Sequence, residues 1–195
     1  MKNPSVQFGV TIIDDQWVFG LYERNRNPWE KHNLKPYTNS NSLETRTARA
    51  IVNIAVGLQI QTRLVDPCCG VGTIVLEALS LAITVHGYEI SWLITQQAKQ
   101  NVSYFGYEDC IVQEDIHWIS ETYDVAILDL PYGLYSTITH AQQKSIINSS
   151  RRITKKLVII TSTDMDEDII SAGFTIVDKC TVNKAMFVRF IRVCH

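Results

Sequence analysis

An α/β fold is predicted for this chain, with a seven-stranded, mostly parallel sheet whose last strand is antiparallel, preceded by an N-terminal β-hairpin and helix. Three observations predict it. From residue 43 onward, short β-branched and apolar runs alternate with segments of helical periodicity. Two of those runs lead into an acid and a turn, at Asp66 and Asp129. The last two runs, Phe174–Val182 and Phe187–Val193, leave no room for a helix between them, so they should pair antiparallel.

The composition limits which kinds of protein this chain can be. The chain has 195 residues, 46% of them apolar, which suits one domain with a sizeable core and a small appendage. The net charge of −2 means that any nucleic-acid contact needs a local patch or a partner. No apolar run reaches the ~18 residues of a membrane span, and the first residues do not form a signal peptide. The odd cysteine count, with two adjacent, predicts a reduced, cytoplasmic protein; the cysteines are Cys68, Cys69, Cys110, Cys180 and Cys194.

Residues 1–42 are predicted to form a β-hairpin and a basic connector, and residues 43–195 the main domain. The hairpin pairs Val6–Ile13 with Trp17–Tyr22, and it is expected to extend and support the main sheet. The connector, residues 23–42, mixes cations with aromatic side chains. That mixture suits RNA contact, through phosphate binding and base stacking, and equally suits a solvated linker. With two cations of the next helix, the set is Arg24, Arg26, Lys31, Lys35, Arg46 and Arg49, and the aromatic residues are Trp29 and Tyr37.

A glycine-rich segment, Asp66-Pro67-Cys68-Cys69-Gly70-Val71-Gly72-Thr73, follows the short strand Arg63–Val65 and precedes a helical pattern. Its glycines allow a sharp turn and the close approach of a ligand to the backbone. A helix N-terminus after such a turn presents N–H groups to a nucleotide-like ligand. The dinucleotide fingerprint is excluded, because position 75 is Val where a third glycine is required. The arrangement instead resembles the first motif of class I, Rossmann-like methyltransferases that use S-adenosylmethionine.

Two more strand ends carry acids. Thr84–Glu89 reads as a strand ending in Glu89, and an acid at the end of the second strand commonly accepts hydrogen bonds from a ribose. Cys110–Gln113 reads as a short strand, followed by Glu114 and Asp115. An acid in that position can accept a hydrogen bond from an adenine amino group. The side chains expected against the adenine ring are Ile90 and Ile116.

A fourth strand, Tyr123–Leu128, delivers a second motif, Asp129-Leu130-Pro131-Tyr132. Ligands of open α/β sheets bind at the carboxyl ends of strands near the switch point, so both motifs should emerge at the same edge. The other elements predicted are helices at Leu43–Val56 (with Ser42 as N-cap), Ser91–Tyr104 (with Ser91 as N-cap), His140–Ile153 and Asp164–Ala172, a strand at Lys156–Thr161, and a tight connection at Asn183-Lys184.

Together the two motifs resemble the amino-methyltransferases. The first motif with Glu77-Ala78, and the lead-in from Arg24 to Arg49, more narrowly resemble the THUMP-associated RNA methylase family, over roughly residues 17–180. That family methylates the 2-amino group of guanosine in tRNA or ribosomal RNA. The resemblance implies a Rossmann-like methyltransferase domain at 43–195, S-adenosylmethionine as cofactor, S-adenosylhomocysteine as product, no metal, and RNA as partner, with tRNA ahead of ribosomal RNA.

The resemblance also implies residue roles. Asp129 and the carbonyl of Leu130 would accept the N–H bonds of the target amine, Pro131 would stiffen the loop, and Tyr132 would stack on the base. Asp115 is favoured over Glu114 for the adenine contact. The cofactor-binding set is then Asp66, Pro67, Cys68, Gly70, Gly72, Thr73, Glu89, Ile90, Asp115 and Ile116.

The sequence departs from the family pattern in two ways. The family form is Asp-Pro-Pro-Tyr, and Leu130 stands at its second position. The few residues before the hairpin cannot contain a THUMP domain. RNA capture is therefore expected from residues 23–49, from a homodimer or an RNA-binding partner subunit, or from Arg151-Arg152 with Lys155-Lys156.

Other functions remain open at this stage. A DNA adenine or protein glutamine amino-methyltransferase shares the second motif, and a non-catalytic RNA-binding subunit could keep the fold. The intact pair Asp66 and Asp129 argues against the last of these. A cysteine nucleophile at 68 or 69 is disfavoured, because direct methyl transfer needs no covalent step.

Overall fold

The computed structural model describes residues 4–23, 27–39, 42–59, 61–131, 138–184 and 187–195. None of the described helices is long and apolar enough to cross a membrane. The elements, in chain order, are β1 (Phe8–Ile13), β2 (Gln16–Leu21), η1 (Pro28–Leu34), α1 (Thr45–Val56), β3 (Arg63–Asp66), α2 (Thr73–Ser80), β4 (Thr84–Glu89), α3 (Trp92–Tyr104), β5 (Ile111–Gln113), η2 (Ile116–Trp118), β6 (Tyr123–Asp129), α4 (His140–Ile153), β7 (Thr154–Thr161), α5 (Asp166–Ser171), β8 (Ile176–Lys184) and β9 (Phe187–Cys194).

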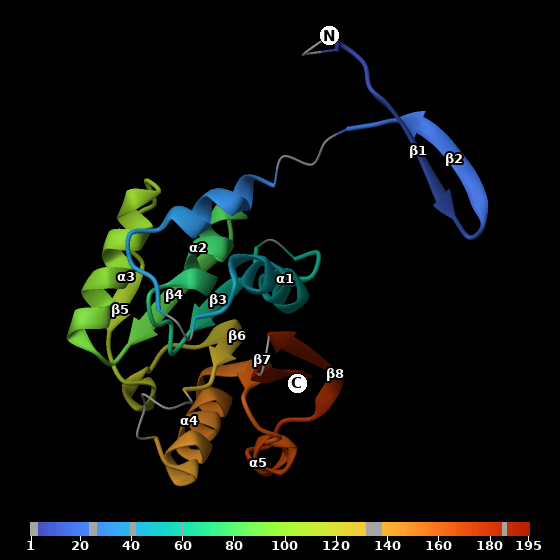
Figure 1. Ribbon diagram of the computed structural model, residues 1–195. Coiled ribbons are helices and arrows are strands. Elements are labelled where there is room, and N and C mark those ends of the chain that lie inside the picture. Colours follow the sequence, from blue (N-terminus) through green and yellow to red (C-terminus); the bar gives the residue numbers. More distant parts are fainter. Residues whose placement is uncertain (1–3, 24–26, 40–41, 60, 132–137, 185–186) are drawn as a thin grey trace.

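Seven of the described strands form one sheet in the order β5-β4-β3-β6-β7-β9-β8 (Figure 1). The first five are parallel to their neighbours, whereas β9 is antiparallel to both β7 and β8. The predicted Rossmann-like architecture is therefore confirmed. Because the chain runs from β3 outward to β5 and then returns to β6 on the other side of β3, the switch point lies between β3 and β6. Asp66 and Asp129 are the last residues of these two strands.

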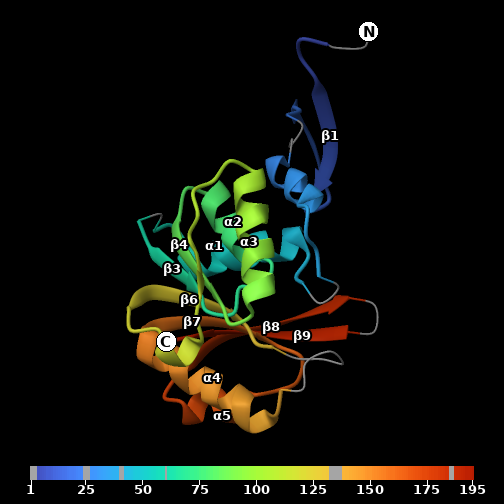
Figure 2. The same ribbon diagram turned by 90° about the vertical axis from the view of Figure 1, so that its left-hand side faces the viewer.

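Helices cover both faces of the sheet (Figure 2). One core forms between the sheet and α1, α2 and α3, and the other between the sheet and α4 and α5. Neighbouring residues of β6 alternate between them: Ile127 lies in the first core and Leu128 in the second, both fully buried. Central strands of such a sheet are continuous apolar runs, and for this reason the sequence pattern predicted them.

The hairpin β1–β2 forms a two-stranded antiparallel sheet of its own. The prediction of the hairpin is confirmed, but the expectation that it extends the main sheet is wrong. Figures 1 and 2 show it standing apart from the α/β body. The turn residues Asp14 and Asp15 have φ of 49° and 60°, as a type I′ turn requires. One face of the ribbon is apolar and between 54% and 78% exposed; it consists of Phe8, Val10, Ile12, Trp17, Phe19 and Leu21.

The connector is packed against the body through a 3-10 helix, η1, that its polar sequence did not predict. His32 of η1 is 1% exposed, and its Nδ1 lies 2.5 Å from Oε1 of Glu77 on α2. Arg49 of α1 reaches the other oxygen of Glu77, with Nη1 at 3.3 Å from Oε2. Burial raises the pKa of Glu77, although His32 and Arg49 oppose the rise. Glu77 therefore joins η1, α1 and α2.

Two predicted details are wrong and one is confirmed. The N-cap of α1 is Glu44 and not Ser42, whose N–H donates to the carbonyl of Asn39. Asn183-Lys184 lies inside β8, so the connection to β9 falls at 185–186, outside the described residues. The N-cap at Ser91 is confirmed, because its side chain accepts the N–H of Ile94 at 3.5 Å. The domain boundary between residues 42 and 43 stays a prediction.

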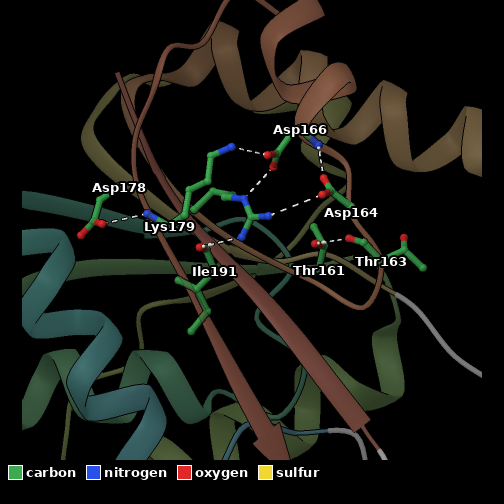
Figure 3. Close-up of polar contacts among 8 residues, drawn as sticks. Thr161, Thr163, Asp164, Asp166, Asp178, Lys179 and Ile191 are labelled. Carbon is green, nitrogen blue, oxygen red and sulfur yellow. Dashed lines mark hydrogen bonds and ion pairs between the residues drawn. The ribbon is translucent and has the colours of Figure 1, made fainter.

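The antiparallel strands are fixed to α5 by a buried arginine. Arg192 of β9 is 5% exposed, and its Nε donates to Oδ1 of Asp166 at 2.6 Å. Lys179 of β8 donates to Oδ2 of the same carboxylate at 2.6 Å (Figure 3). One acid at the start of α5 therefore holds the last two strands.

Candidate active site

The glycine turn joins β3 to α2 at the switch point. Asp66 is 1% exposed, and its Oδ1 accepts the N–H of Cys68 at 3.4 Å; Pro67 between them is buried. Gly70 and Gly72 have φ of 53° and 82°, in the left-handed region that favours glycine. Gly72 is the N-cap residue of α2, so the free N–H groups of that helix begin at this turn.

Glu89 shapes the turn from the neighbouring strand. It ends β4 and is 9% exposed. Its Oε2 accepts the N–H of Gly70 at 3.1 Å, and its Oε1 accepts the N–H of Ser91 at 2.9 Å. Burial raises the pKa of Glu89 more than these hydrogen bonds lower it. Because each carboxylate oxygen has two lone pairs, Glu89 keeps the capacity to accept from a ligand hydroxyl.

A third strand end carries the acid predicted at the adenine position. Asp115 follows β5 and caps η2; its Oδ1 accepts the N–H of His117 at 3.0 Å and lies 2.5 Å from His117 Nδ1. Burial raises the pKa of Asp115, but these contacts with His117 outweigh burial and lower it overall. Ile90 is 65% exposed and Ile116 only 3%, so Ile90 offers more surface to a ring.

The second motif begins at the end of β6. Burial raises the pKa of Asp129 to about 7, against the opposing charge of Arg189. Leu130 is 1% exposed within the core beneath α4 and α5, and its N–H bonds the carbonyl of Ile160 at 2.9 Å. Burial of the side chain accounts for Leu at this position. The carbonyl of Pro131 accepts from Gln143 Nε2 at 2.9 Å. Tyr132 lies outside the described residues.

The two motifs face one site. In the register of β3 and β6, Val65 lies opposite Ala126, which places Asp66 and Asp129 on the same face of the sheet. Their charges interact: burial raises the pKa of Asp66 well above its usual value, and Asp129 raises it further. The thiol pKa of Cys68 is raised in the same way, first by burial and then by four carboxylates. They are Asp66, Glu89, Asp115 and Asp129. The predicted acids therefore converge around the glycine turn.

Two buried polar atoms at this site lack a hydrogen-bond partner among the described residues. They are Oγ1 of Thr73, in the first turn of α2, and Oδ1 of Asp129. Buried polar atoms in native proteins nearly always have partners. Both atoms belong to residues predicted to touch cofactor or substrate, so a bound ligand would satisfy them.

The raised pKa of Cys68 and Cys69 bears on the cysteine alternative. Burial is the largest cause for both, and neighbouring carboxylates add to it. A thiol is nucleophilic only as the thiolate. Neither cysteine therefore meets the requirement of a nucleophile at neutral pH.

Sequence reasoning missed Asn101, which ties the connector to the glycine turn. Asn101 of α3 is fully buried, and its Nδ2 donates to the carbonyl of Val71 at 2.9 Å. It also pairs with the backbone of Tyr37: Oδ1 accepts the N–H, and Nδ2 donates to the carbonyl, each at 2.9 Å. The signal available was an asparagine on the apolar face of a predicted helix, a position that needs buried partners.

The structure divides the predicted RNA-contacting cations. Arg49 is held by Glu77 and Ser80, and Lys35 is buried, with its pKa lowered by burial against the charge of Glu77. Lys31 and Arg46 are exposed, whereas Arg24 and Arg26 lie outside the described residues. Arg152 donates to the carbonyls of η2, so it supports the segment that carries Asp115.

Comparison with solved structures agrees with this fold. TrmN from Thermus thermophilus has a TM-score of 0.67 at 20% identity, covering 100% of this chain and 60% of that chain. Magnesium protoporphyrin IX methyltransferase from Synechocystis, solved with bound SAM, has a TM-score of 0.63 at 16% identity, covering 88% and 99%. At such identities the likeness establishes the fold alone.

The sequence is similar to two curated proteins named tRNA (guanine(10)-N2)-dimethyltransferase. The protein of Pyrococcus abyssi is 30% identical over 114 residues, and that of Methanothermobacter thermautotrophicus 29% over 103 residues. These matches cover 55% and 51% of this chain but only 34% and 30% of the relatives. A family model described as RMKL-like, methyltransferase domain, matches residues 32–172, which include both motifs and every strand from β3 to β7. The chain belongs to this family of methyltransferase domains.

Proposed function

We propose that this chain is an S-adenosylmethionine-dependent methyltransferase that modifies an exocyclic amino group of RNA. The target group is the 2-amino group of guanosine, and tRNA ranks ahead of ribosomal RNA as the substrate. The observation that carries the proposal is the convergence of the glycine turn and Asp129 at one switch point. Membership of the family, and relatives named for guanine N2 methylation of tRNA, support the same chemistry here.

The residues around the glycine turn fit the cofactor. The glycine turn and the first residues of α2 offer backbone N–H groups. Thr73 offers a buried hydroxyl that has no hydrogen-bond partner among the described residues. We assign Glu89 to the ribose hydroxyls, Asp115 to the adenine amino group and Ile90 to the adenine ring, with Ile116 behind it. When bound, the cofactor supplies an electrophilic methyl group. The backbone of the turn, with Asp66, Pro67, Cys68, Gly70 and Gly72, positions it.

The second motif fits the amine. An amino group on an aromatic base is a weak nucleophile, because its lone pair is delocalised into the ring. Asp129 and the carbonyl of Leu130 accept its two N–H bonds and so orient the lone pair. A pKa of about 7 lets Asp129 take up a proton near neutral pH. Pro131 holds the loop, and Tyr132 provides a stacking surface worth ~1–3 kcal/mol for a base taken out of its stack.

RNA capture is assigned to the N-terminal part and to a second subunit. Residues 43–195 carry the chemistry, and the exposed cations Lys31 and Arg46 provide phosphate contacts at the connector. A net charge of −2 gives the chain little general attraction for RNA. A second copy or an RNA-binding partner subunit therefore supplies the remaining contacts.

The test is methyl transfer to defined nucleic acids. The purified chain is incubated with S-adenosylmethionine and unmodified tRNA transcripts, ribosomal RNA or adenine-containing DNA, and the digested nucleosides are analysed by mass spectrometry. We expect N2-methylated guanosine from tRNA. Methyladenine from DNA, or no methylated nucleoside although calorimetry shows cofactor binding, would overturn the assignment.

A further inference from the structure

Arg189 lies on the same face and at the same edge of the sheet as Asp129. Asp129 of β6 is paired with Ile160 of β7, and Ile160 with Ile191 of β9. Directly paired residues point to the same face, and the period along a strand is two. Arg189, two residues before Ile191, therefore shares the face of Asp129. Because β9 is antiparallel to β7, position 189 also lies toward the carboxyl ends of the parallel strands.

Arg189 is a buried residue whose charge acts on Asp129. The residue is 9% exposed, and charged groups are rarely buried so far unless they are paired. Burial raises the pKa of Asp129, and the charge of Arg189 lowers it. The charge of Asp129 in turn raises the pKa of two other groups, Asp66 of β3 and Cys68 of the glycine turn. Both become negative when ionised, whereas Arg189 carries the positive charge that acts on Asp129.

We propose that Arg189 is a positioning residue for the methyl transfer, holding the Asp129 side chain in the charged form that accepts the N–H of the target amine. The proposal rests on the function proposed above. A carboxyl as buried as Asp129 would otherwise keep its proton near neutral pH and present a hydroxyl donor to an amine that is itself a donor. β9 is the second strand over from β6, roughly 10 Å away at the spacing of paired strands, so the side chain of Arg189 has to reach across β7 to act on Asp129.

The first experiment measures the charge of Asp129 without any substrate. Asp129 is followed by 13C NMR of aspartate carboxyl groups across a pH titration, with Asp129→Asn used for assignment. The variants are Arg189→Gln, which removes the charge, and Arg189→Lys, which keeps it. Arg192→Lys is the matched control, because Arg192 contacts Asp166 away from the site. We expect the midpoint of Asp129 to rise by about one pH unit in Arg189→Gln and to stay near the wild-type value in the other two. An unchanged midpoint in a folded Arg189→Gln variant would overturn the proposal, whatever the protein methylates.

The second experiment compares pH–rate profiles with saturating tRNA. The acid limb of kcat should move to higher pH in Arg189→Gln, with Arg189→Lys restoring most of the wild-type profile. A contact between Arg189 and an RNA phosphate predicts otherwise: a raised KM for RNA, a weaker salt dependence and an unmoved acid limb. That second pattern would also overturn the proposal. Absence of transfer in the wild-type protein would count against the proposed function, and the NMR titration would still decide the role of Arg189.

Discussion

Burial is the main cause of the shifted pKa values of single residues at this site. Asp129 ends a buried strand, and burial raises its pKa to about 7 even though Arg189 lies near. Its Oδ1 lacks a partner among the described residues. Both features are costly in a folded protein unless a ligand or a reaction uses them. The residue is therefore suited to exchange a proton with a bound amine.

Replacing this carboxylate should abolish turnover and spare the cofactor. We expect Asp129→Asn to lower kcat by about 10²–10⁴-fold, the usual contribution of a positioned acid or base. Affinity for S-adenosylmethionine should change less than about twofold by calorimetry, because Asp129 belongs to the amine side of the site. Asp178→Asn, on the exposed strand β8, is the control and should behave as wild type. Near-normal turnover in Asp129→Asn would remove Asp129 from the mechanism.

At the scale of elements, the hairpin and the α/β body are separate structures. The two strands pair only with each other in the described part of the chain, and their apolar face is exposed. An isolated hairpin is at best marginally stable in water. By contrast, the connector that follows is fixed by His32 at Glu77 and by Asn101 at Tyr37. Stability of the body should therefore be independent of the hairpin.

A change on the exposed face of the hairpin tests this independence. Trp17→Ser, at a residue that is 75% exposed, should change the unfolding free energy of the body by no more than about 0.5 kcal/mol. Ile127→Ala, in the fully buried centre of β6, should cost about 2–5 kcal/mol. Both values come from denaturant unfolding followed by circular dichroism. A loss of several kcal/mol in Trp17→Ser would mean that the hairpin supports the body after all.

At the scale of the whole molecule, the closing antiparallel strands supply a residue that the parallel strands lack. Folding back of β9 beside β7 brings Arg189 to the same face and the same edge of the sheet as Asp129. On its opposite face β9 carries Arg192, whose Nε donates to Asp166 of α5. Burial raises the pKa of Asp166, but hydrogen bonds from Lys179 and Arg192 outweigh it and lower the pKa overall.

Asp166 makes one contribution to the pH dependence of stability. A depressed pKa in the folded state contributes stability above the unfolded value of about 3.9, and that contribution is lost as pH falls through the lower folded value. We expect Asp166→Asn to lower the melting temperature at pH 7, and the difference from wild type to shrink below about pH 4. Calorimetry at pH 7, 5 and 3 measures it, with the exposed Asp178→Asn as control. A difference that stays constant down to pH 3 would contradict the assigned charge interaction.

The amino-acid pattern was sufficient for the α/β fold, for the succession of strands and helices from β3 to β9 along the chain, and for the acids at the strand ends. These are local properties: apolar runs buried on both faces, glycines at positive φ, and a carboxylate placed where a strand must stop. The role predicted for the Leu130 carbonyl stays a prediction; the structure shows that the Leu130 side chain is buried and that its N–H bonds the carbonyl of Ile160. The prediction of an N-cap at Ser42 failed because α1 begins two residues later than expected, with Glu44 at the N-cap.

Contacts between distant segments had no local signal. Arg189 lies far along the chain from Asp129, and Asn101 from Tyr37, so only the pairing of strands and the packing of α3 bring each pair together. The hairpin pattern likewise fixed its own pairing and not its place relative to the sheet, since register is local while docking depends on a complementary surface. The acids at the two strand ends could be found from short sequence motifs. The charge of Arg189, which lowers the pKa of Asp129, is brought near only by the tertiary structure.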